Sequence, residues 1–198
     1  MKKEVVLVFQ KNAILGKVKT RLASEMGEAR ALEIYRHLVQ STYSVLEDVS
    51  APVWTYYSDF IPETVNPPIA KSFVQEGHDL GERMANAFAR SFESGMEKVV
   101  LIGTDCPTLQ SHHLHEAFEA LTHSDLVVGP ATDGGYYLIG MKRRADYLFE
   151  GISWSTSQVL TETLNVASQH GLTTTLLQEL NDIDTSEDWE RYTSNSDY

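Results

Sequence analysis

Short apolar runs alternate along the chain with amphipathic helical patterns, and this alternation constrains the fold more than any other feature. The apolar runs are nearly continuous, as is typical of parallel strands that are buried on both faces. Alternating strands and helices predict an α/β protein, a three-layer α/β/α sandwich whose mostly parallel sheet lies between its helices. The predicted strands are Glu4–Gln10, Val53–Tyr57, Ala70–Gln75, Val99–Ile102, Leu126–Val128, Tyr136–Met141 and Thr173–Leu177.

Spacings of three and four residues between apolar side chains predict the helices. The first runs from Gly27 to Val49, and Lys11 to Ser24 before it is expected to be a polar loop. The segment 130–135 between two predicted strands is too short for a crossover, so those strands are either antiparallel neighbours or splay apart. We expect one domain over residues 1–193 and a flexible tail over residues 194–198. The later helices are expected to begin near Asp79, Ser111, Ser157 and Thr185.

Charge and cysteine content limit the class of protein. The 198 residues carry 28 acidic and 16 basic side chains, a net charge of −12. Such a charge argues against binding to nucleic acid or anionic membranes, since both need a basic surface. No apolar run approaches the ~20 residues of a membrane span, and the first run is too short for the core of a signal peptide. The single cysteine, Cys106, cannot form an internal disulfide, so we expect a cytoplasmic protein.

The segment after the first predicted strand is rich in basic residues. Lys11, Lys17, Lys19 and Arg21 lie within eleven residues that contain no acid, on either side of Gly16. A basic loop with a glycine at this place in an α/β sheet is suited to hold phosphates. The segment lacks the glycine spacing of a P-loop or of a dinucleotide-binding fingerprint. A loop whose basic side chains only face solvent remains the alternative.

A carboxylate follows the strand Val99–Ile102. The strand runs into Gly-Thr-Asp-Cys-Pro, which places Asp105 at its carboxyl end. Ligands of open α/β sheets bind beyond the carboxyl ends of the strands. A carboxylate there can hold Mg²⁺ or Mn²⁺ that bridges phosphates, because hard cations take oxygen ligands. The alternative is an aspartate that caps the turn beginning at Pro107.

Three further positions are candidates for binding. Asp133 precedes two glycines, which let the backbone approach a ligand closely, although Asp-Gly is also the strongest hairpin-turn pair. Asp184 is either a second metal ligand or a polar residue that leads into a capped helix. Trp154, Ser155 and Thr156 lie in a loop where they could contact a sugar or a base, and the alternative for Thr156 is that it caps a helix.

Six short motifs, taken together, resemble a family of bacterial proteins. The set is similar to the DUF2064 glycosyltransferase-like family, described as nucleotide-diphospho-sugar transferases. The resemblance implies a GT-A-like fold related to the molybdopterin and phospholactate guanylyltransferases. The chain departs from the family at Ala13, where a proline is usual. The motifs run in order from Phe9 to Asp188 and are K-x-x-x-x-G-x-V-K-T-R-L, D-L-G-E-R-M, G-T-D-C-P, P-A-x-D-G-G-Y-Y-L-I-G, W-S-T and D-I-D-T-x-E-D.

The resemblance implies a role for each matching residue. Catalysis would fall to Lys19, Arg21 and Asp133. Metal binding would fall to Asp105 with Asp184, or with Asp133, and the cofactor would be Mg²⁺ or Mn²⁺. The positions implied to bind the nucleotide are Lys11, Gly16, Lys19, Thr20, Arg21, Gln75 and Gly81, the last two as readers of its base. The positions implied to bind the other substrate are Gly134, Gly135, Tyr136, Trp154 and Thr156.

Two reactions fit this set of residues, and the preferred one is glycosyl transfer from a nucleoside diphosphate-sugar to a small-molecule acceptor. Asp133 would then serve as a base for the acceptor hydroxyl. The alternative is nucleotidyl transfer, in which a substrate phosphate attacks an NTP and pyrophosphate leaves. Both depend on positioning and on charge stabilisation by the cation and the basic loop. A non-catalytic nucleotide-binding domain is the third interpretation, and a homodimer is among the oligomeric states that the sequence allows.

Overall fold

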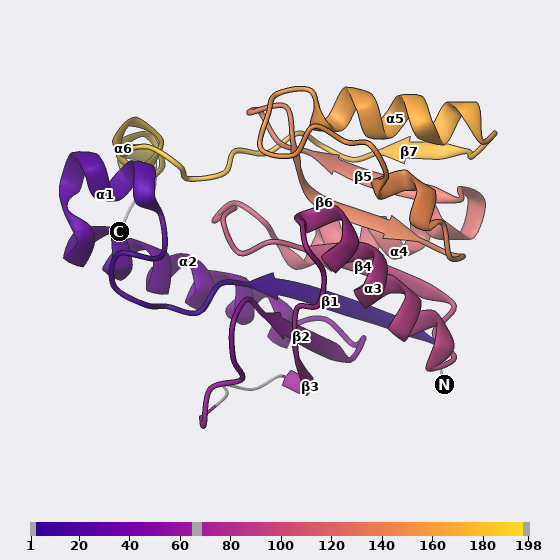
Figure 1. Cartoon of the computed structure of the whole chain (residues 1–198), viewed down its shortest axis with the longest axis horizontal. Helices are drawn as coiled ribbons and strands as arrows, with labels where there is room; N and C mark the ends of the chain where they lie inside the picture. The colour runs from indigo at the N-terminus through magenta and orange to yellow at the C-terminus, as the bar shows by residue number, and fades with distance from the viewer. Residues whose placement is uncertain (1–2, 65–68, 196–198) are drawn as a thin grey trace.

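The computed structural model describes residues 3–64 and 69–195 of the chain. Its described strands form one seven-stranded sheet in the order β3-β2-β1-β4-β6-β5-β7 (Figure 1). Strand β6 runs antiparallel to β4 and β5, and the other pairs are parallel. The strands are β1 (Glu4–Gln10), β2 (Val53–Tyr57), β3 (Ile69–Val74), β4 (Lys98–Ile102), β5 (Leu126–Pro130), β6 (Tyr136–Met141) and β7 (Thr174–Leu176).

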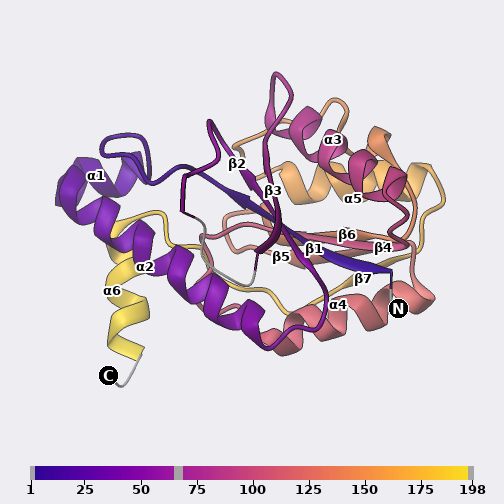
Figure 2. The same ribbon diagram turned by 90° about the horizontal axis from the view of Figure 1, so that it is seen from below.

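Helices cover both faces of this sheet, which confirms the predicted α/β architecture (Figure 2). Helices α2 and α4 lie on one face, and α3 and α5 lie on the other. Among the described residues, none of the helices combines the length and the apolar character that a membrane crossing requires. The helices are α1 (Thr20–Met26), α2 (Glu28–Glu47), α3 (Leu80–Glu93), α4 (Ser111–His123), α5 (Val159–Gln169) and α6 (Ser186–Asn195), with a 3₁₀ helix η1 (Asp146–Phe149).

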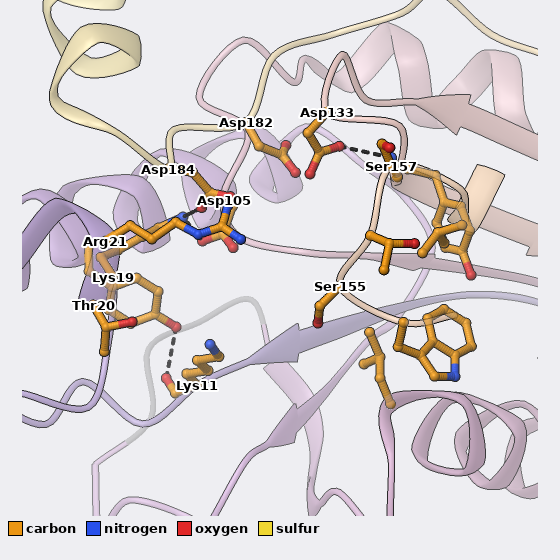
Figure 3. A pocket seen from close by; sticks show the side chains of 17 residues that line it. Lys11, Lys19, Thr20, Arg21, Asp105, Asp133, Ser155, Ser157, Asp182 and Asp184 are labelled. Atoms are coloured by element: carbon orange, nitrogen blue, oxygen red, sulfur yellow. Dashed lines mark hydrogen bonds and ion pairs between the residues drawn. The ribbon is translucent and has the colours of Figure 1, made fainter. Parts of the chain in front are cut away.

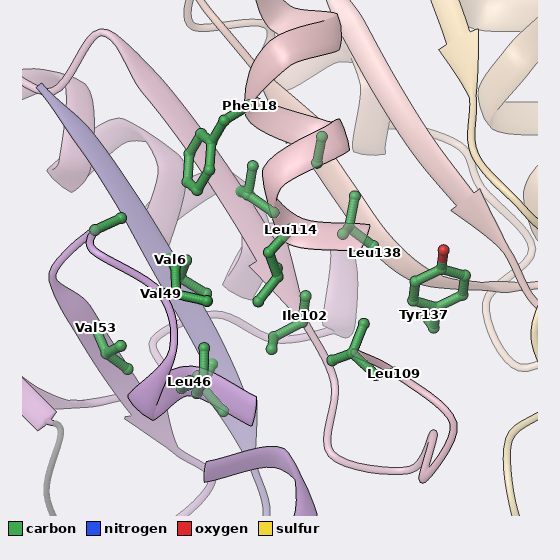
Figure 4. Packing of buried hydrophobic residues seen from close by; sticks show 14 of the residues in the cluster. Val6, Leu46, Val49, Val53, Ile102, Leu109, Leu114, Phe118, Tyr137 and Leu138 are labelled. Carbon is green, nitrogen blue, oxygen red and sulfur yellow. The ribbon is translucent and has the colours of Figure 1, made fainter. Parts of the chain in front are cut away.

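The alternation of side chains along the strands builds a separate core on each face. In β1, Val6 and Val8 point toward α2 and α4, whereas Val5 and Leu7 point toward α3 and η1. Figure 4 shows the first of these cores, where Leu114 and Phe118 of α4 pack over the strands. Because central strands such as β1 are buried on both faces, their sequences are nearly continuously apolar, whereas the edge strands β3 and β7 are partly exposed.

A third apolar cluster lies at one end of the molecule, away from the sheet. Leu22 of α1 and Ile34 of α2 pack there against Ile183 and against Trp189 of α6. The backbone N–H of Ser186 also donates to the Glu25 carboxylate at 3.0 Å. These contacts bind the end of the chain to its first helices, and they fix the segment that precedes α6.

Two predicted details differ from the structure. The polar loop expected over Lys11 to Ser24 ends early, because α1 begins at Thr20 and buries Leu22 in the third cluster. A seven-residue helix is too short for its apolar spacing to stand out in the sequence, and it is stabilised by long-range contacts instead. Helix α6 includes Ser194 and Asn195, the first two residues of the expected tail, and the rest of that tail, residues 196–198, lies outside the described residues. Strands β5 and β6 are antiparallel neighbours, one of the two arrangements left open.

Two of the helices begin with the side-chain caps that their sequences predict. At α3, the Asp79 carboxylate accepts a hydrogen bond from the Glu82 N–H at 2.8 Å. At α6, Thr185 Oγ1 accepts from the Asp188 N–H at 3.3 Å, and the Asp188 carboxylate accepts in return from the Thr185 N–H at 2.9 Å. Each cap satisfies an N–H group that has no partner within its helix.

Replacing Asp79 tests how much the α3 cap stabilises the fold. Asp79→Ala should lower the free energy of unfolding by about 1 kcal/mol, because the exposed first turn of α3 loses its acceptor. Urea denaturation at neutral pH measures this change. The control Asp79→Asn keeps a capping oxygen and should stay close to the parent protein. An Asp79→Ala variant as stable as the parent would show that water replaces the cap at no cost.

Candidate active site

A pocket of about 590 Å³ opens at the carboxyl ends of β1 and β4 (Figure 3). This is the edge at which open α/β sheets bind their ligands. The segments that supply its walls follow β1, β4 and β5, precede α5, and connect β7 to α6. The lining residues are Lys11, Lys19, Thr20, Arg21, Tyr35, Leu80, Asp105, Asp133, Gly135, Tyr136, Trp154, Ser155, Thr156, Ser157, Val159, Asp182 and Asp184.

Lys19 lies between two carboxylates at one end of the pocket. Its Nζ is 2.8 Å from Asp105 Oδ1 and 3.1 Å from Asp184 Oδ1, and its side chain is only 5% exposed. Arg21 approaches the other oxygen of Asp184 at 3.7 Å and is 70% exposed. Figure 3 shows Lys19 and Arg21 directed toward this carboxylate pair. Two acids and two bases, drawn from three distant parts of the sequence, therefore meet at one point.

Backbone pairing places Asp184 beside Asp105. The Ile183 N–H donates to the Asp105 carbonyl at 2.9 Å. Just upstream, Leu180 forms a parallel bridge with Ala131 at the end of β5. Burial of Ile183 in the third apolar cluster holds the segment from the opposite side. Asp182 and Asp184, the residues on either side of Ile183, both line the pocket.

The conformation and charge of Lys19 are both fixed by its surroundings. Its backbone is left-handed, with φ 48° and ψ 50°, at the residue before α1. Burial alone lowers the pKa of the ammonium, but Asp105 and Asp184 outweigh that effect and raise the pKa above its ordinary value. Lys19 is therefore a buried cation at neutral pH. A left-handed non-glycine residue is a small strain of the kind found at functional sites.

Asp182 adds a third carboxylate to this end of the pocket. Its Oδ1 is buried and has no hydrogen-bond partner among the described residues. Burial, and then the nearby charge of Asp105, raise its pKa to about 7 from an ordinary value near 3.8. The Lys19 ammonium acts in the opposite direction but does not cancel these effects. An unpaired acid in this position is ready to accept either a proton or a metal ion.

Lys11 reaches the pocket from the loop that follows β1. Its carbonyl accepts a hydrogen bond from the Tyr35 hydroxyl of α2 at 2.8 Å. The next residue, Asn12, is buried and ties this loop to the segment after β2 through its Oδ1, which accepts from the Asp59 N–H at 2.9 Å. Hydrogen bonds to α2 and to the segment after β2 therefore hold the loop from which Lys11 reaches the pocket.

Two loops that pack against each other form another wall of the pocket, which begins at Asp133 beside Asp182 (Figure 3). The Asp133 carboxylate accepts a hydrogen bond from the Gly135 N–H at 2.9 Å, which closes a tight turn between β5 and β6. Gly134 has φ +88°, and a Cβ there would lie 2.3 Å from the Ser157 carbonyl oxygen. The Gly134 carbonyl also accepts from the Leu160 N–H at 2.9 Å. Only glycine allows this contact between the turn and the loop before α5.

The loop before α5 carries hydroxyl groups and one indole into the pocket. Ser155 has a left-handed backbone with φ 64°. The indole of Trp154 packs over Gly81 of α3, where a Cβ would lie 2.8 Å from Trp154 Nε1. Every basic residue that lines the pocket comes from the first loop and α1, so the end formed by Ser155 and Trp154 has no positive charge of its own.

Most of the predicted site residues come together in this pocket, and four do not line it. Gly16 lies beside Glu28, and Gly134 is covered by Ser157. Gln75 donates its amide to the Tyr56 carbonyl at 3.0 Å. Gly81 lies beneath Trp154, and the neighbouring Leu80 lines the pocket instead.

Several lining residues had no predicted role: Tyr35, Leu80, Ser157, Val159 and Asp182. Of these, Asp182 could have been found from the sequence. It is two residues from Asp184 with the apolar Ile183 between them, a spacing that puts both acids on one face of an extended segment. The other four depend on how loops and helices pack, and no local pattern marks them.

The carboxylate oxygens suit a divalent metal ion. Asp105 and Asp184 already converge on one cation, the Lys19 ammonium, and Asp182 brings an unpartnered oxygen nearby. Within residues 3–64 and 69–195, no three acid, histidine or cysteine side chains are gathered as a complete metal site. This fits Mg²⁺ or Mn²⁺, which commonly takes one or two protein carboxylates and completes its shell with phosphate and water.

Comparison with proteins of known structure gives a close match. A crystal structure from Desulfovibrio desulfuricans G20, assigned as a nucleotide-diphospho-sugar transferase, is 33% identical with a TM-score of 0.91, covering 100% of this chain and 90% of that chain. The structure of Rv0371C from Mycobacterium tuberculosis H37Rv in complex with manganese has a TM-score of 0.61 at 13% identity, with 98% of each chain covered. The fold is thus that of the nucleotidyltransferase and GT-A-like proteins.

Sequence comparison identifies a more distant relative and the family. A 2-phospho-L-lactate guanylyltransferase of Methanocaldococcus vulcanius is 23% identical over 142 residues, which is 71% of this chain and 64% of that protein. The match therefore spans less than two thirds of the length of this relative. A family model described as "Uncharacterized protein conserved in bacteria (DUF2064)" matches residues 46–156, more than half of the chain. As the sequence motifs imply, the chain belongs to the DUF2064 family of bacterial proteins.

Proposed function

We propose that this protein is a metal-dependent nucleotidyltransferase that takes a nucleoside triphosphate and a phosphorylated small molecule and releases pyrophosphate. The observation that carries the proposal is the convergence of Asp105 and Asp184 on one cation, with Arg21 and Lys11 lining the same pocket. Carboxylates that can hold a metal, next to basic side chains that can face phosphates, are what phosphoryl chemistry needs. The guanylyltransferase relative supports this reaction class, and the manganese complex of the same fold supports the metal.

The proposed reaction makes and breaks one bond at the α-phosphorus. An oxygen of the substrate phosphate attacks it, and the bond from the α-phosphorus to the oxygen that bridges to the β-phosphorus breaks. A bound Mg²⁺ or Mn²⁺, held by Asp105 and Asp184, would neutralise charge on the phosphates. Arg21 and Lys11 stabilise the negative charge of the departing pyrophosphate. A base is not required, because the attacking phosphate is already an anion.

Glycosyl transfer is a second candidate, and two observations favour it. The D. desulfuricans protein is assigned as a nucleotide-diphospho-sugar transferase. Asp133 lines the pocket beside Gly135, at the end where the hydroxyl-bearing loop faces it. In this reaction Asp133 would accept the proton of an acceptor hydroxyl while a nucleoside diphosphate leaves. Nucleotidyl and glycosyl transfer differ in the donor that the pocket takes, so the donor distinguishes them.

A thermal-shift screen of the four NTPs and of nucleoside diphosphate-sugars, each with and without Mn²⁺, tests the proposed function. An NTP with Mn²⁺ should raise the melting temperature by mass action, and the rise should exceed those given by NTP or Mn²⁺ alone. Production of pyrophosphate from the stabilising NTP and a phosphorylated acceptor would then establish the reaction. A response confined to nucleoside diphosphate-sugars would favour glycosyl transfer and contradict nucleotidyl transfer.

Asp105→Asn should remove the rise in melting temperature given by NTP with Mn²⁺, because an amide cannot neutralise a divalent cation. The matched control is Asp48→Asn, which makes the same charge change at an exposed residue at the end of α2. The control should respond to the ligands like the parent protein. Retention of the full response by Asp105→Asn would show that Asp105 does not hold the metal.

Asp182→Asn should stabilise the metal-free protein at pH 8. A carboxyl whose pKa is raised to about 7 in the folded state binds its proton more tightly there than in the unfolded chain, so folding loses stability as pH rises from 4 to 8. At pH 8 this amounts to as much as about 4 kcal/mol. The advantage of the variant should shrink by about half at pH 5. Urea denaturation at both pH values checks it, and an advantage that is absent at pH 8 would refute the interpretation.

A further inference from the structure

We propose that the Asp105–Asp184 pair accepts a divalent cation only together with a triphosphate, so that the pocket binds the metal–triphosphate complex rather than the free ion. Lys19 occupies the two carboxylates in this structure, and the phosphates must draw it away before the metal can take its place. This inference rests on the proposed function, since it assumes a metal at Asp105 and Asp184.

The contact that must break is short and shielded from water. The Lys19 ammonium lies 2.8 Å from Asp105 Oδ1 and 3.1 Å from Asp184 Oδ1, with 5% of the side chain exposed. Both distances are those of charge-assisted hydrogen bonds. The carboxylates themselves are more open, at 41% and 37% exposed, so a metal complex can reach them from the pocket.

A metal ion that bridged the pair would compete for the oxygens that Lys19 holds. One Oδ1 from each aspartate contacts the ammonium, and the second oxygen of Asp184 faces Arg21 at 3.7 Å. A divalent cation placed on these oxygens would lie within a few ångströms of a buried positive charge. Coulomb repulsion at that separation is strong where water is scarce. The charge of these two carboxylates is therefore already balanced by Lys19 and Arg21 when a free ion arrives.

The triphosphate supplies what the free ion lacks, a new partner for Lys19. Lys19, Arg21 and Lys11 line one pocket, so phosphates bound beside the metal would lie within reach of the released ammonium. The lysine side chain is long and flexible, and it can turn from carboxylate to phosphate while α1 stays anchored by buried Leu22. Because coupling is reciprocal, the triphosphate then raises the affinity for the metal as much as the metal raises the affinity for the triphosphate.

Binding of Mn²⁺ and of inorganic tripolyphosphate to Lys19→Met tests this coupling. In titration calorimetry with Mn²⁺ alone, the variant should bind the ion about tenfold or more tightly than the parent, because the internal cation is gone. In a thermal-shift measurement with tripolyphosphate and Mn²⁺ together, the same variant should lose most of the parent's stabilisation. Opposite changes in the two assays distinguish an exchange of partners from simple damage to the pocket, which would weaken both.

Lys17→Met is the matched control, because Lys17 is an exposed lysine of the same loop that does not line the pocket. It should behave like the parent protein in both assays. If Lys19→Met does not fold, Lys19→Gln replaces it in both assays. Binding of Mn²⁺ to the parent protein also tests the inference without any variant. Tight binding of Mn²⁺ to the parent without phosphate, with Kd below about 10 μM, would overturn the inference.

The outcomes separate this inference from the proposed function. If tripolyphosphate with Mn²⁺ stabilises the parent protein but Lys19→Met gains no affinity for Mn²⁺, the exchange is refuted and the transferase proposal stands. If no NTP or tripolyphosphate stabilises the parent with Mn²⁺, the transferase proposal fails. A gain of Mn²⁺ affinity in Lys19→Met would even then support Lys19 as the occupant of a metal site.

Discussion

The buried contact of Lys19 with Asp105 and Asp184 is the interaction on which the pocket depends. It joins the loop after β1, the end of β4 and the segment before α6 at one point. None of these segments is fixed by the sheet alone, and each is held by a neighbour: α1 by Leu22, and the last segment by Ile183. A charge cluster assembled in this way makes the first and last parts of the chain interdependent.

The same sheet edge explains why the pocket has two unlike ends. Parallel strands β1 and β4 bring charged loops to one end, where the turn between β5 and β6 also places Asp133 beside Asp182, and the loop before α5 forms the other end with Trp154. The close approach of Gly134 to Ser157 then fixes the hydroxyl-bearing loop against that turn. The result is a charged end suited to phosphates and an end without basic side chains, which suits a transferase that binds phosphates at one end and another group at the other.

The sequence was sufficient to predict the sheet and most of the charged residues that line the pocket. It was insufficient for elements whose position depends on packing between distant parts of the chain. A continuously apolar sequence such as that of β1 predicts a buried strand. The place of Asp105 at the end of a predicted strand likewise predicts that it lines the pocket. Helix α1 did not follow, because contacts with distant parts of the chain, chiefly in the third apolar cluster, stabilise it. Gly81 carries a sequence motif yet lies beneath Trp154, since a motif does not reveal whether a glycine faces a ligand or a neighbouring ring. The partners of Lys19 lie far away in sequence, and no local spacing encodes them.

A crystal structure with Mn²⁺ and a non-hydrolysable NTP analogue would test the central claim most directly. Anomalous scattering locates the manganese without reference to any assumed ligand. The account predicts one strong anomalous peak within about 2.3 Å of carboxylate oxygens of Asp105 and Asp184, with the Lys19 ammonium moved onto a phosphate. A peak remote from both aspartates, or Lys19 still bound between them while the metal and triphosphate are present, would contradict it.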